Sequence, residues 1–186
     1  MNATEHIVEL YFRICRKCFT MRDVKVLNGN NRQIDLLAYS VLTQDQYHIE
    51  VGVTHCPEFC SSAQGLTSEF DAKFFGKPPQ RKGKNTDYAK GKTYEKKICD
   101  TYASVGFTPE KVQCIWCCWI VPNASELDGV LQEYAKTSKH SVTVLSFRDE
   151  VLPELQNLIG TSNYEDEVLR TLSLLHQQLR QTTKSI

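Results

Sequence analysis

Two neighbouring segments of alternating polarity, residues 33–42 and 47–54, constrain most strongly how this chain of 186 residues can fold. Apolar residues occupy every second position in both: Ile34, Leu36 and Ala38 in the first segment, and Ile49, Val51 and Val53 in the second. A period of two is typical of a β-strand that places one face against a core. The polar link between the segments is short, so we expect the two strands to pair as an antiparallel hairpin.

The rest of the pattern predicts further helices and strands around this hairpin. We expect helices at residues 5–19, 63–75, 93–104, 125–137, 150–159 and 164–180, and strands at 21–27, 111–121 and 141–147. A three-strand antiparallel meander followed by strands that alternate with helices implies a mixed sheet flanked by helices. The predicted fold class is therefore α/β. We expect one domain over residues 1–186, with a C-terminal helical part at about 149–182.

Composition excludes several classes of protein. With 41% apolar and 24% charged residues, the chain is neither disordered nor collagen-like. No apolar run reaches the roughly 18 residues of a membrane-spanning helix. Charges within the opening sequence MNATEHIVELYFR argue against a signal peptide. We therefore expect a soluble, cytoplasmic protein that has no membrane partner and keeps its eight cysteines reduced.

A long connection interrupts the predicted skeleton. Residues 56–91 exceed an ordinary connection and are interpreted as a basic insertion. The overlapping residues 71–97, here called the basic segment, hold nine basic and three acidic residues, although the whole chain has a net charge of zero. Such a segment is either a solvated loop or an arm that contacts nucleic-acid phosphates. The phosphate contacts would come from Lys73, Lys77, Arg81, Lys82, Lys84, Lys90 and Lys92, and Phe74, Phe75, Tyr88 and Tyr94 would stack on bases.

Two carboxylates are placed together by the alternation of the hairpin. If both apolar sets face the core, Asp35 and Glu50 share the opposite face on neighbouring strands. Two carboxylates this close repel each other unless a cation lies between them. Hard oxygen ligands suit Mg²⁺ or Mn²⁺, and such an ion can activate water for attack on a phosphate. The alternative is that both acids are solvated on an exposed face.

The two strands also carry a family resemblance. QIDLLAY at 33–39 and YHIEVGV at 47–53, behind a helix and an alternating strand, resemble the PD-(D/E)xK nuclease superfamily, most closely its small branches similar to Holliday-junction resolvases. The resemblance covers about residues 5–54, and the later order of elements is compatible with it. It implies a restriction-endonuclease-like fold and a deoxyribonuclease that acts on DNA with Mg²⁺ or Mn²⁺ as cofactor.

The resemblance also implies roles for single residues. Asp35 would bridge the metal, Glu50 would be the second ligand, and the backbone carbonyl of Val51 the third. Gln33 departs from the pattern, because several relatives have Glu there. Gly52 departs more seriously, because it occupies the position of the family's lysine, which orients water and stabilises transition-state charge. Some members supply this lysine from elsewhere, and here the candidates are Lys90, Lys92, Lys96 and Lys97. Among these four we choose Lys92 as the expected catalytic lysine.

The first helix offers one further acidic candidate. Glu5 fits the family's helical Glu better than Glu9, because it lies at the edge of the apolar stripe while Glu9 points away from it. In that role Glu5 would assist through metal-bound water. The other interpretation is that Glu5 closes a capping box with Asn2.

Cysteines provide an alternative metal site. Cys15 and Cys18 have CxxC spacing, and Cys56 and Cys60 with His55 form a second cluster, so four zinc ligands are available. However, Cys15 and Cys18 both fall on the apolar face of the predicted first helix. Core packing is therefore the preferred interpretation, and zinc is not expected.

Three functions remain in view at this point. The first is the metal-dependent nuclease. The second is a catalytically inactive member of the same fold that binds nucleic acid or serves in assembly, and the third is an intracellular protein-interaction domain whose basic segment contacts an acidic partner. The final helix leaves one question open, because its apolar stripe either packs on the sheet or forms a homodimer face: Val168, Leu169, Leu172, Leu175 and Leu179.

Overall fold

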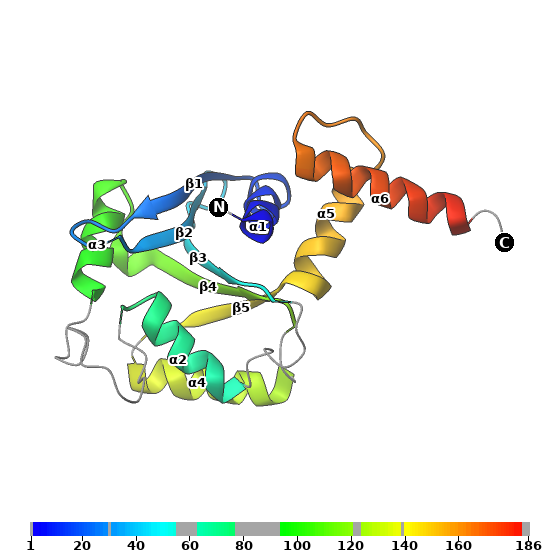
Figure 1. The fold of residues 1–186 in the computed structure, drawn as a ribbon. Helices are drawn as coiled ribbons and strands as arrows, with labels where there is room; N and C mark the ends of the chain where they lie inside the picture. The colour runs from blue at the N-terminus through cyan, green and yellow to red at the C-terminus, as the bar shows by residue number, and fades with distance from the viewer. Residues whose placement is uncertain are drawn as a thin grey trace.

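The hairpin is the centre of a five-stranded sheet (Figure 1). The computed structural model describes residues 2–29, 31–54, 63–76, 94–120, 124–138 and 140–183. The strands lie side by side in chain order: β1 (Cys18–Lys25), β2 (Gln33–Ser40), β3 (Gln46–Gly52), β4 (Val112–Cys118) and β5 (Val142–Ser146). β1, β2 and β3 pair antiparallel, whereas β3, β4 and β5 pair parallel. The predicted α/β class with a mixed sheet is confirmed.

Helices cover both faces of the sheet, as Figure 1 shows. One face carries α1 (Ala3–Ile14), α5 (Leu152–Ile159) and α6 (Glu167–Thr183), and the other carries α2 (Ala63–Lys73) and α4 (Ala124–Ser138). The remaining helix, α3 (Glu95–Ser104), packs against β1 and β2. A 3₁₀ turn at Pro109–Lys111 leads into β4, and a π-helical turn at Phe147–Val151 joins β5 to α5. Parallel pairing of β3 with β4, and of β4 with β5, requires crossover connections, which contain α2 and α3 in the first case and α4 in the second.

The first helix begins and ends through local interactions. Asn2 Oδ1 accepts a hydrogen bond from the Glu5 backbone N–H at 3.0 Å, and Glu5 Oε2 accepts one from the Asn2 backbone N–H at 2.9 Å. The predicted capping box is therefore present. The helix ends at Ile14, so the prediction that it reaches Phe19 is wrong. Lys17 has φ of 55°, a left-handed conformation that interrupts the helix, and Cys18 begins β1 instead.

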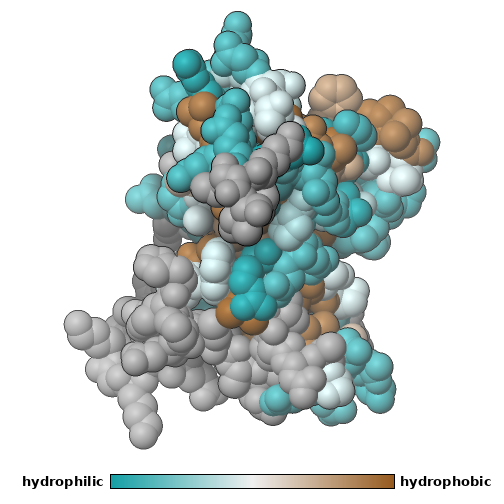
Figure 2. Space-filling model, turned by 90° about the vertical axis from the view of Figure 1, so that its right-hand side faces the viewer, coloured by the Kyte–Doolittle hydropathy of each residue, from teal (hydrophilic) through white to brown (hydrophobic). Residues whose placement is uncertain are grey.

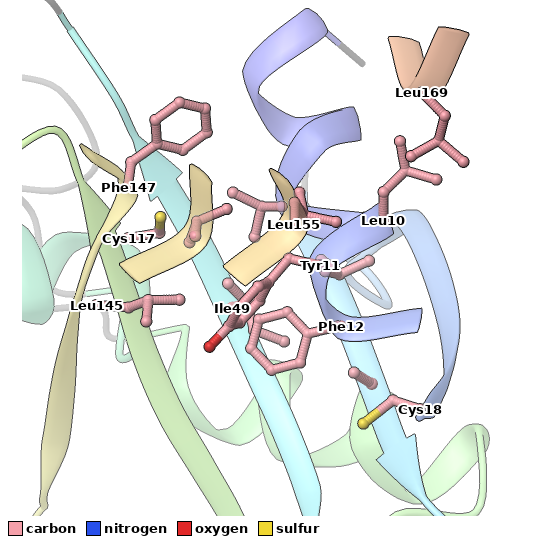
Figure 3. Close-up of a cluster of buried hydrophobic side chains, with 14 of the residues drawn as sticks. Leu10, Tyr11, Phe12, Cys18, Ile49, Cys117, Leu145, Phe147, Leu155 and Leu169 are labelled. Atoms are coloured by element: carbon pink, nitrogen blue, oxygen red, sulfur yellow. The ribbon is translucent and has the colours of Figure 1, made fainter. Parts of the chain in front are cut away.

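The main core lies between the sheet and α1, α5 and α6 (Figure 3). All five strands, α1, α5, α6 and the π-helical turn contribute buried side chains, among them Leu10, Tyr11, Phe12, Ile49, Cys117, Leu145, Leu155 and Leu169. A second cluster fills the space between β4, β5 and the helices α2 and α4, with Leu66, Phe70, Phe74, Trp116, Leu127 and Tyr134. Both sheet faces are thus covered, so the face opposite Ile49 is also largely buried.

The apolar stripe of α6 divides into two halves. Leu169 is buried, and Val168 and Leu172 pack against the main core, as the packing interpretation predicted. Leu175 and Leu179, further along the same stripe, are exposed. Figure 2 views the side on which α5 and α6 lie, and apolar patches appear among hydrophilic surface in its upper half. The homodimer face remains a prediction.

No helix within the described residues is long and apolar enough to cross a membrane.

The two faces of α5 give a direct test of the main core. Leu155 is fully buried, so truncation to alanine should lower the free energy of unfolding by about 2–5 kcal/mol. Leu158, on the same helix, is 57% exposed, and Leu158→Ala should change the free energy of unfolding by no more than about 0.5 kcal/mol. Urea denaturation of both variants measures the difference. Equal losses would contradict the orientation of α5.

Candidate active site

Asp35 and Glu50 lie where β2 and β3 stop pairing. The ladder between these strands runs from Tyr39↔Gln46 to Leu36↔Ile49, and the two acids follow its last pair on opposite strands. Leu36 and Ile49 face the main core, so Asp35 and Glu50 lie on the opposite face, as the alternation predicted. That face is covered by helices, and Glu50 is only 1% exposed. The alternative of two solvated acids is therefore wrong for Glu50.

The surroundings of Asp35 disfavour the charged form of its carboxyl group. Its Oδ2 accepts a hydrogen bond of 2.9 Å from the backbone N–H of Val51. Burial raises the pKa of Asp35 from 3.8 to about 6, and the negative charges of Glu50 and Glu5 act in the same direction, against the hydrogen bond from Val51 and the charge of Lys73. The contact with Val51 uses its backbone N–H, and the proposed role of its carbonyl as a metal ligand stays a prediction.

Glu50 contacts a different group with each oxygen. Oε1 accepts a hydrogen bond of 2.9 Å from Nε2 of His48, and Oε2 lies 3.1 Å from the ammonium nitrogen of Lys73. Oε2 makes an ion pair but no hydrogen bond of acceptable geometry, although it is buried. Burial raises the pKa of Glu50, but the hydrogen bond from His48 and the charge of Lys73 outweigh it and lower the pKa. Glu50 therefore carries its negative charge inside the protein.

Lys73 is the cation of this site, and it comes from the last residue of α2. Its side chain is 43% exposed, so the ammonium group lies between buried Glu50 and solvent. Burial lowers the pKa of Lys73, but the charges of Glu50 and Asp35 raise it above its usual value. Arg32 donates hydrogen bonds to the backbone carbonyls of Ala72 and Lys73, which fastens the C-terminal end of α2 to the start of β2.

The lysine that lies beside Glu50 is not one of the four candidates chosen from the sequence. Lys73 was expected to contact nucleic acid, whereas Lys96 and Lys97 were candidates for the migrated lysine. Lys96 pairs with Asp100 at 3.0 Å, and Lys97 donates to the backbone carbonyl of Asn28. Neither is directed at Glu50, so both candidates are wrong. The predictions for Lys77, Arg81, Lys82, Lys84, Lys90 and Lys92 lie outside the described residues.

Gly52 is explained by the neighbouring strand. A Cβ atom on Gly52 would lie 2.3 Å from Cζ2 of Trp116, far inside van der Waals contact. Trp116 is 5% exposed and packs in the second cluster, so its ring cannot easily move away. A larger side chain therefore does not fit at position 52 unless Trp116 moves. The tryptophan ring fills the space, and the ammonium group reaches Glu50 from α2.

Other acidic and polar candidates have different surroundings. Glu5 closes the capping box, as its second interpretation stated, although its charge still acts on Asp35. The helical wheel places Glu9 away from the apolar stripe, but its side chain is nevertheless buried. It is 4% exposed, accepts a hydrogen bond from Thr20 Oγ1 at 2.9 Å and pairs with Arg22 at 3.3 Å, so it packs against β1 through polar contacts. Gln33 is exposed at the start of β2, two residues before Asp35 on the same face.

Two predicted stacking residues are unavailable to bases. Phe74 and Phe75 are 1% and 6% exposed and belong to the second cluster. Tyr94 is half-buried, with the Lys97 ammonium over its ring. Stacking by Phe74 and Phe75 is therefore wrong, because both rings pack into the second cluster directly after the end of α2. The prediction for Tyr88 lies outside the described residues.

The cysteine alternative is resolved in part. Cys18 is buried in the main core and Cys15 packs against it, so core packing explains both. Cys18 does so from β1 rather than from the first helix. His55, Cys56 and Cys60 lie outside the described residues. Among the residues that are described, no three His, Cys, Asp or Glu side chains form a group that could hold a metal ion.

A buried histidine and tyrosine complete the surroundings of Glu50, and the sequence reasoning missed both. His48 is fully buried, and its Nδ1 lies 2.5 Å from the hydroxyl oxygen of Tyr102 on α3. The alternation that predicts Glu50 on the face opposite Ile49 also predicts His48 there, because the two residues are two positions apart. That signal was available. The contribution of Tyr102 depends on how α3 packs and has no equivalent signal.

Comparisons with known proteins add no relative. No protein-family model, curated protein or solved structure matches this chain.

The packing of Trp116 against Gly52 predicts a stability difference between two glycines. Gly52→Ala should lower the free energy of unfolding by about 1–3 kcal/mol, because the new methyl group overlaps the indole ring. Gly129 lies in α4 with open space around it, and Gly129→Ala should raise the free energy of unfolding by up to about 1 kcal/mol. Thermal and urea unfolding measure both changes. An unchanged stability for Gly52→Ala would show that Trp116 does not occupy this space.

The raised pKa of Asp35 predicts a pH dependence with a definite sign. Because the pKa is about 6 in the folded protein and near 3.8 otherwise, the folded state binds this proton more tightly than the unfolded state. The stabilising contribution is complete below pH 4 and is lost as the pH rises through 6. Asp35→Asn cannot titrate, so its stability relative to the wild type should increase between pH 4 and pH 7 by up to about 3 kcal/mol.

This comparison is made by urea denaturation in EDTA, so that no divalent cation contributes. A relative stability of Asp35→Asn that decreases with rising pH would mean that the folded protein favours the charged form of Asp35.

Proposed function

We propose that this protein is a divalent-metal-dependent phosphodiesterase that hydrolyses DNA. The observation that carries the proposal is the ammonium nitrogen of Lys73 at 3.1 Å from Glu50, on the face that also holds Asp35. Two carboxylates and a lysine are the residue types that the PD-(D/E)xK resemblance implies. The expected position of the lysine is filled by Trp116, and a helix supplies an equivalent group.

The chemistry of the two acids fits a divalent cation. The pKa of Asp35 is raised mainly by burial and by the charge of Glu50, so the pair lacks positive charge even with Lys73 present. Glu50 Oε2 is buried without a hydrogen bond and can accept a further cationic partner. Mg²⁺ and Mn²⁺ favour oxygen ligands, keep several waters and are commonly held by one or two carboxylates. Asp35 and Glu50 would hold the ion, with Val51 as the proposed third ligand.

Each residue has a distinct role in this proposal. A divalent cation, when bound, supplies Lewis acidity at the phosphate and acidifies water. Lys73 would donate N–H groups to the phosphate oxygen on which negative charge develops. Its raised pKa keeps the amine protonated at neutral pH, so it stabilises charge and does not serve as a base. Hydrolysis then forms a bond between water oxygen and phosphorus and breaks the bond to one deoxyribose oxygen.

The charge of the sequence that follows Lys73 is consistent with a nucleic-acid substrate. Lys73 stands near the beginning of the basic segment, which has six more basic than acidic residues. A stretch of chain with this excess of positive charge would bind phosphates through counterion release, and the binding would weaken with salt. The balanced charge of the whole chain implies that this binding is confined to one region.

A non-catalytic nucleic-acid-binding module is the second candidate, and the burial of Glu50 favours it. Glu50 is 1% exposed, with a cation or donor already at each oxygen, so the pair could serve only to hold α2 against the sheet. This candidate predicts salt-dependent DNA binding without hydrolysis. The interaction-domain alternative predicts no salt-dependent binding to DNA at all.

The deciding assay incubates the full chain with duplex, branched and single-stranded DNA in Mn²⁺ or Mg²⁺, with EDTA as a blank. The nuclease should cleave at least one substrate only with the metal, and Asp35→Ala should abolish cleavage. Lys73→Met should lower the rate about 10²–10³-fold, because one charge-stabilising donor is removed. Lys96→Met is the matched control, since Lys96 is 86% exposed and pairs with Asp100 away from the site.

Two outcomes would decide against the proposal. Cleavage that survives Asp35→Ala would come from another site or a contaminant. Salt-dependent DNA binding with no metal-dependent cleavage of any substrate would favour the non-catalytic module.

A further inference from the structure

His48 stands between Glu50 and Tyr102 in the interior of the protein. Its ring nitrogens contact both partners, Nε2 at 2.9 Å from Glu50 Oε1 and Nδ1 at 2.5 Å from the Tyr102 hydroxyl. The rings of Phe74 and His48 meet nearly at right angles, with 4.8 Å between ring centroids and 74° between planes. The ring is 0% exposed, and the three contacts restrict its rotation.

The chemistry of the three groups sets the direction of the hydrogen bonds. A charged carboxylate only accepts, so Nε2 of His48 carries the proton that is donated to Glu50. Towards the Tyr102 hydroxyl, Nδ1 accepts when the imidazole is neutral and donates when the ring is protonated, and in both states Nε2 donates to Glu50. Burial raises the pKa of Tyr102 well above its usual value, so the phenol keeps its proton. The donor on Nε2 therefore points towards Glu50.

This arrangement decides which oxygen of Glu50 remains available. Oε1 is engaged by His48, and Oε2 faces Lys73 without a hydrogen bond. Rotating the plane of the carboxylate away from this arrangement would break the bond from His48 and leave a buried polar atom unpaired, at a cost of about 1–3 kcal/mol. The orientation of the carboxylate is thus set by groups that themselves lie behind it, away from Lys73.

We propose that His48 and Tyr102 are positioning residues that fix the carboxylate of Glu50 with Oε2 directed at the cation site. This inference rests on the proposed function, because it assigns a purpose to the orientation of a proposed metal ligand. Hydrogen bonds behind a metal ligand are a general means of fixing its orientation, and their loss weakens metal affinity by about 10–100-fold. Tyr102 belongs to α3, so the packing of that helix also bears on the site.

The test removes one hydroxyl group and leaves the fold intact. Tyr102→Phe deletes the hydroxyl that contacts His48, and Tyr134→Phe is the matched control, because Tyr134 is a buried tyrosine on the same sheet face whose hydroxyl contacts Asp71 at 2.8 Å. Mn²⁺ affinity is measured by titration calorimetry on the full chain. Tyr102→Phe should weaken Mn²⁺ binding about tenfold, while Tyr134→Phe should leave it unchanged.

A conservative pair of variants at His48 separates positioning from packing. His48→Gln retains an N–H donor near the position of Nε2 and should keep Mn²⁺ affinity within about threefold of the wild type. His48→Leu fills similar space without a donor and should weaken binding about 10–100-fold. Equal affinities for the Gln and Leu variants would overturn the role of the donor.

A second readout does not depend on metal. In the metal-free protein, the proton on Nε2 of His48 should give a protected, downfield NMR signal that shifts or broadens in Tyr102→Phe and is unchanged in Tyr134→Phe. An unaltered signal in Tyr102→Phe would overturn the positioning role. If the signal responds but the wild type binds no Mn²⁺, the proposed function fails while the orientation of Glu50 by His48 stands. If the wild type binds Mn²⁺ and Tyr102→Phe binds equally well, the positioning role fails and the function stands.

Discussion

The charge of Glu50 inside the protein is the constraint on which much of the remaining structure depends. An unpaired carboxylate in the interior is strongly unfavourable, so the residues around Glu50 must supply donors and positive charge. His48 does so from the same strand, and Lys73 from the end of α2. Tyr102 holds His48 from α3. The buried charge of Glu50 thereby links the sheet to α2 and α3, the helices at the two ends of the basic segment. A shift of either helix would disturb the contacts that stabilise this charge.

Trp116 explains why the cation arrives from a helix. On β3 a side chain at position 52 would project into space that the indole ring on β4 occupies. The ring adds apolar packing to the second cluster. The positive charge must then enter from the edge of the site, where α2 ends and Arg32 holds its last carbonyls. Trp116 thus adds apolar packing and excludes a side chain at position 52, and Lys73 at the end of α2 supplies the positive charge.

Local patterns predicted much of the framework. Alternation in residues 33–42 and 47–54 was enough for the hairpin and for the shared face of Asp35 and Glu50. The spacing of Asn2 and Glu5 predicted the capping box, and apolar periodicity predicted α2 and the crossover helices. The end of the first helix was missed, because the left-handed conformation of Lys17 has no marker in residue type. The burial of Glu9 was missed because it depends on contacts with β1.

The sequence by itself determined the order of elements, the α/β class and the side of the sheet on which the two acids lie, because strand alternation and helix periodicity are properties of neighbouring residues. Only the tertiary structure decided which lysine meets Glu50, why position 52 is glycine and how His48 is held. Those contacts join β3 to α2, α3 and β4. They depend on where separate helices and strands pack, and no spacing within one segment encodes that information.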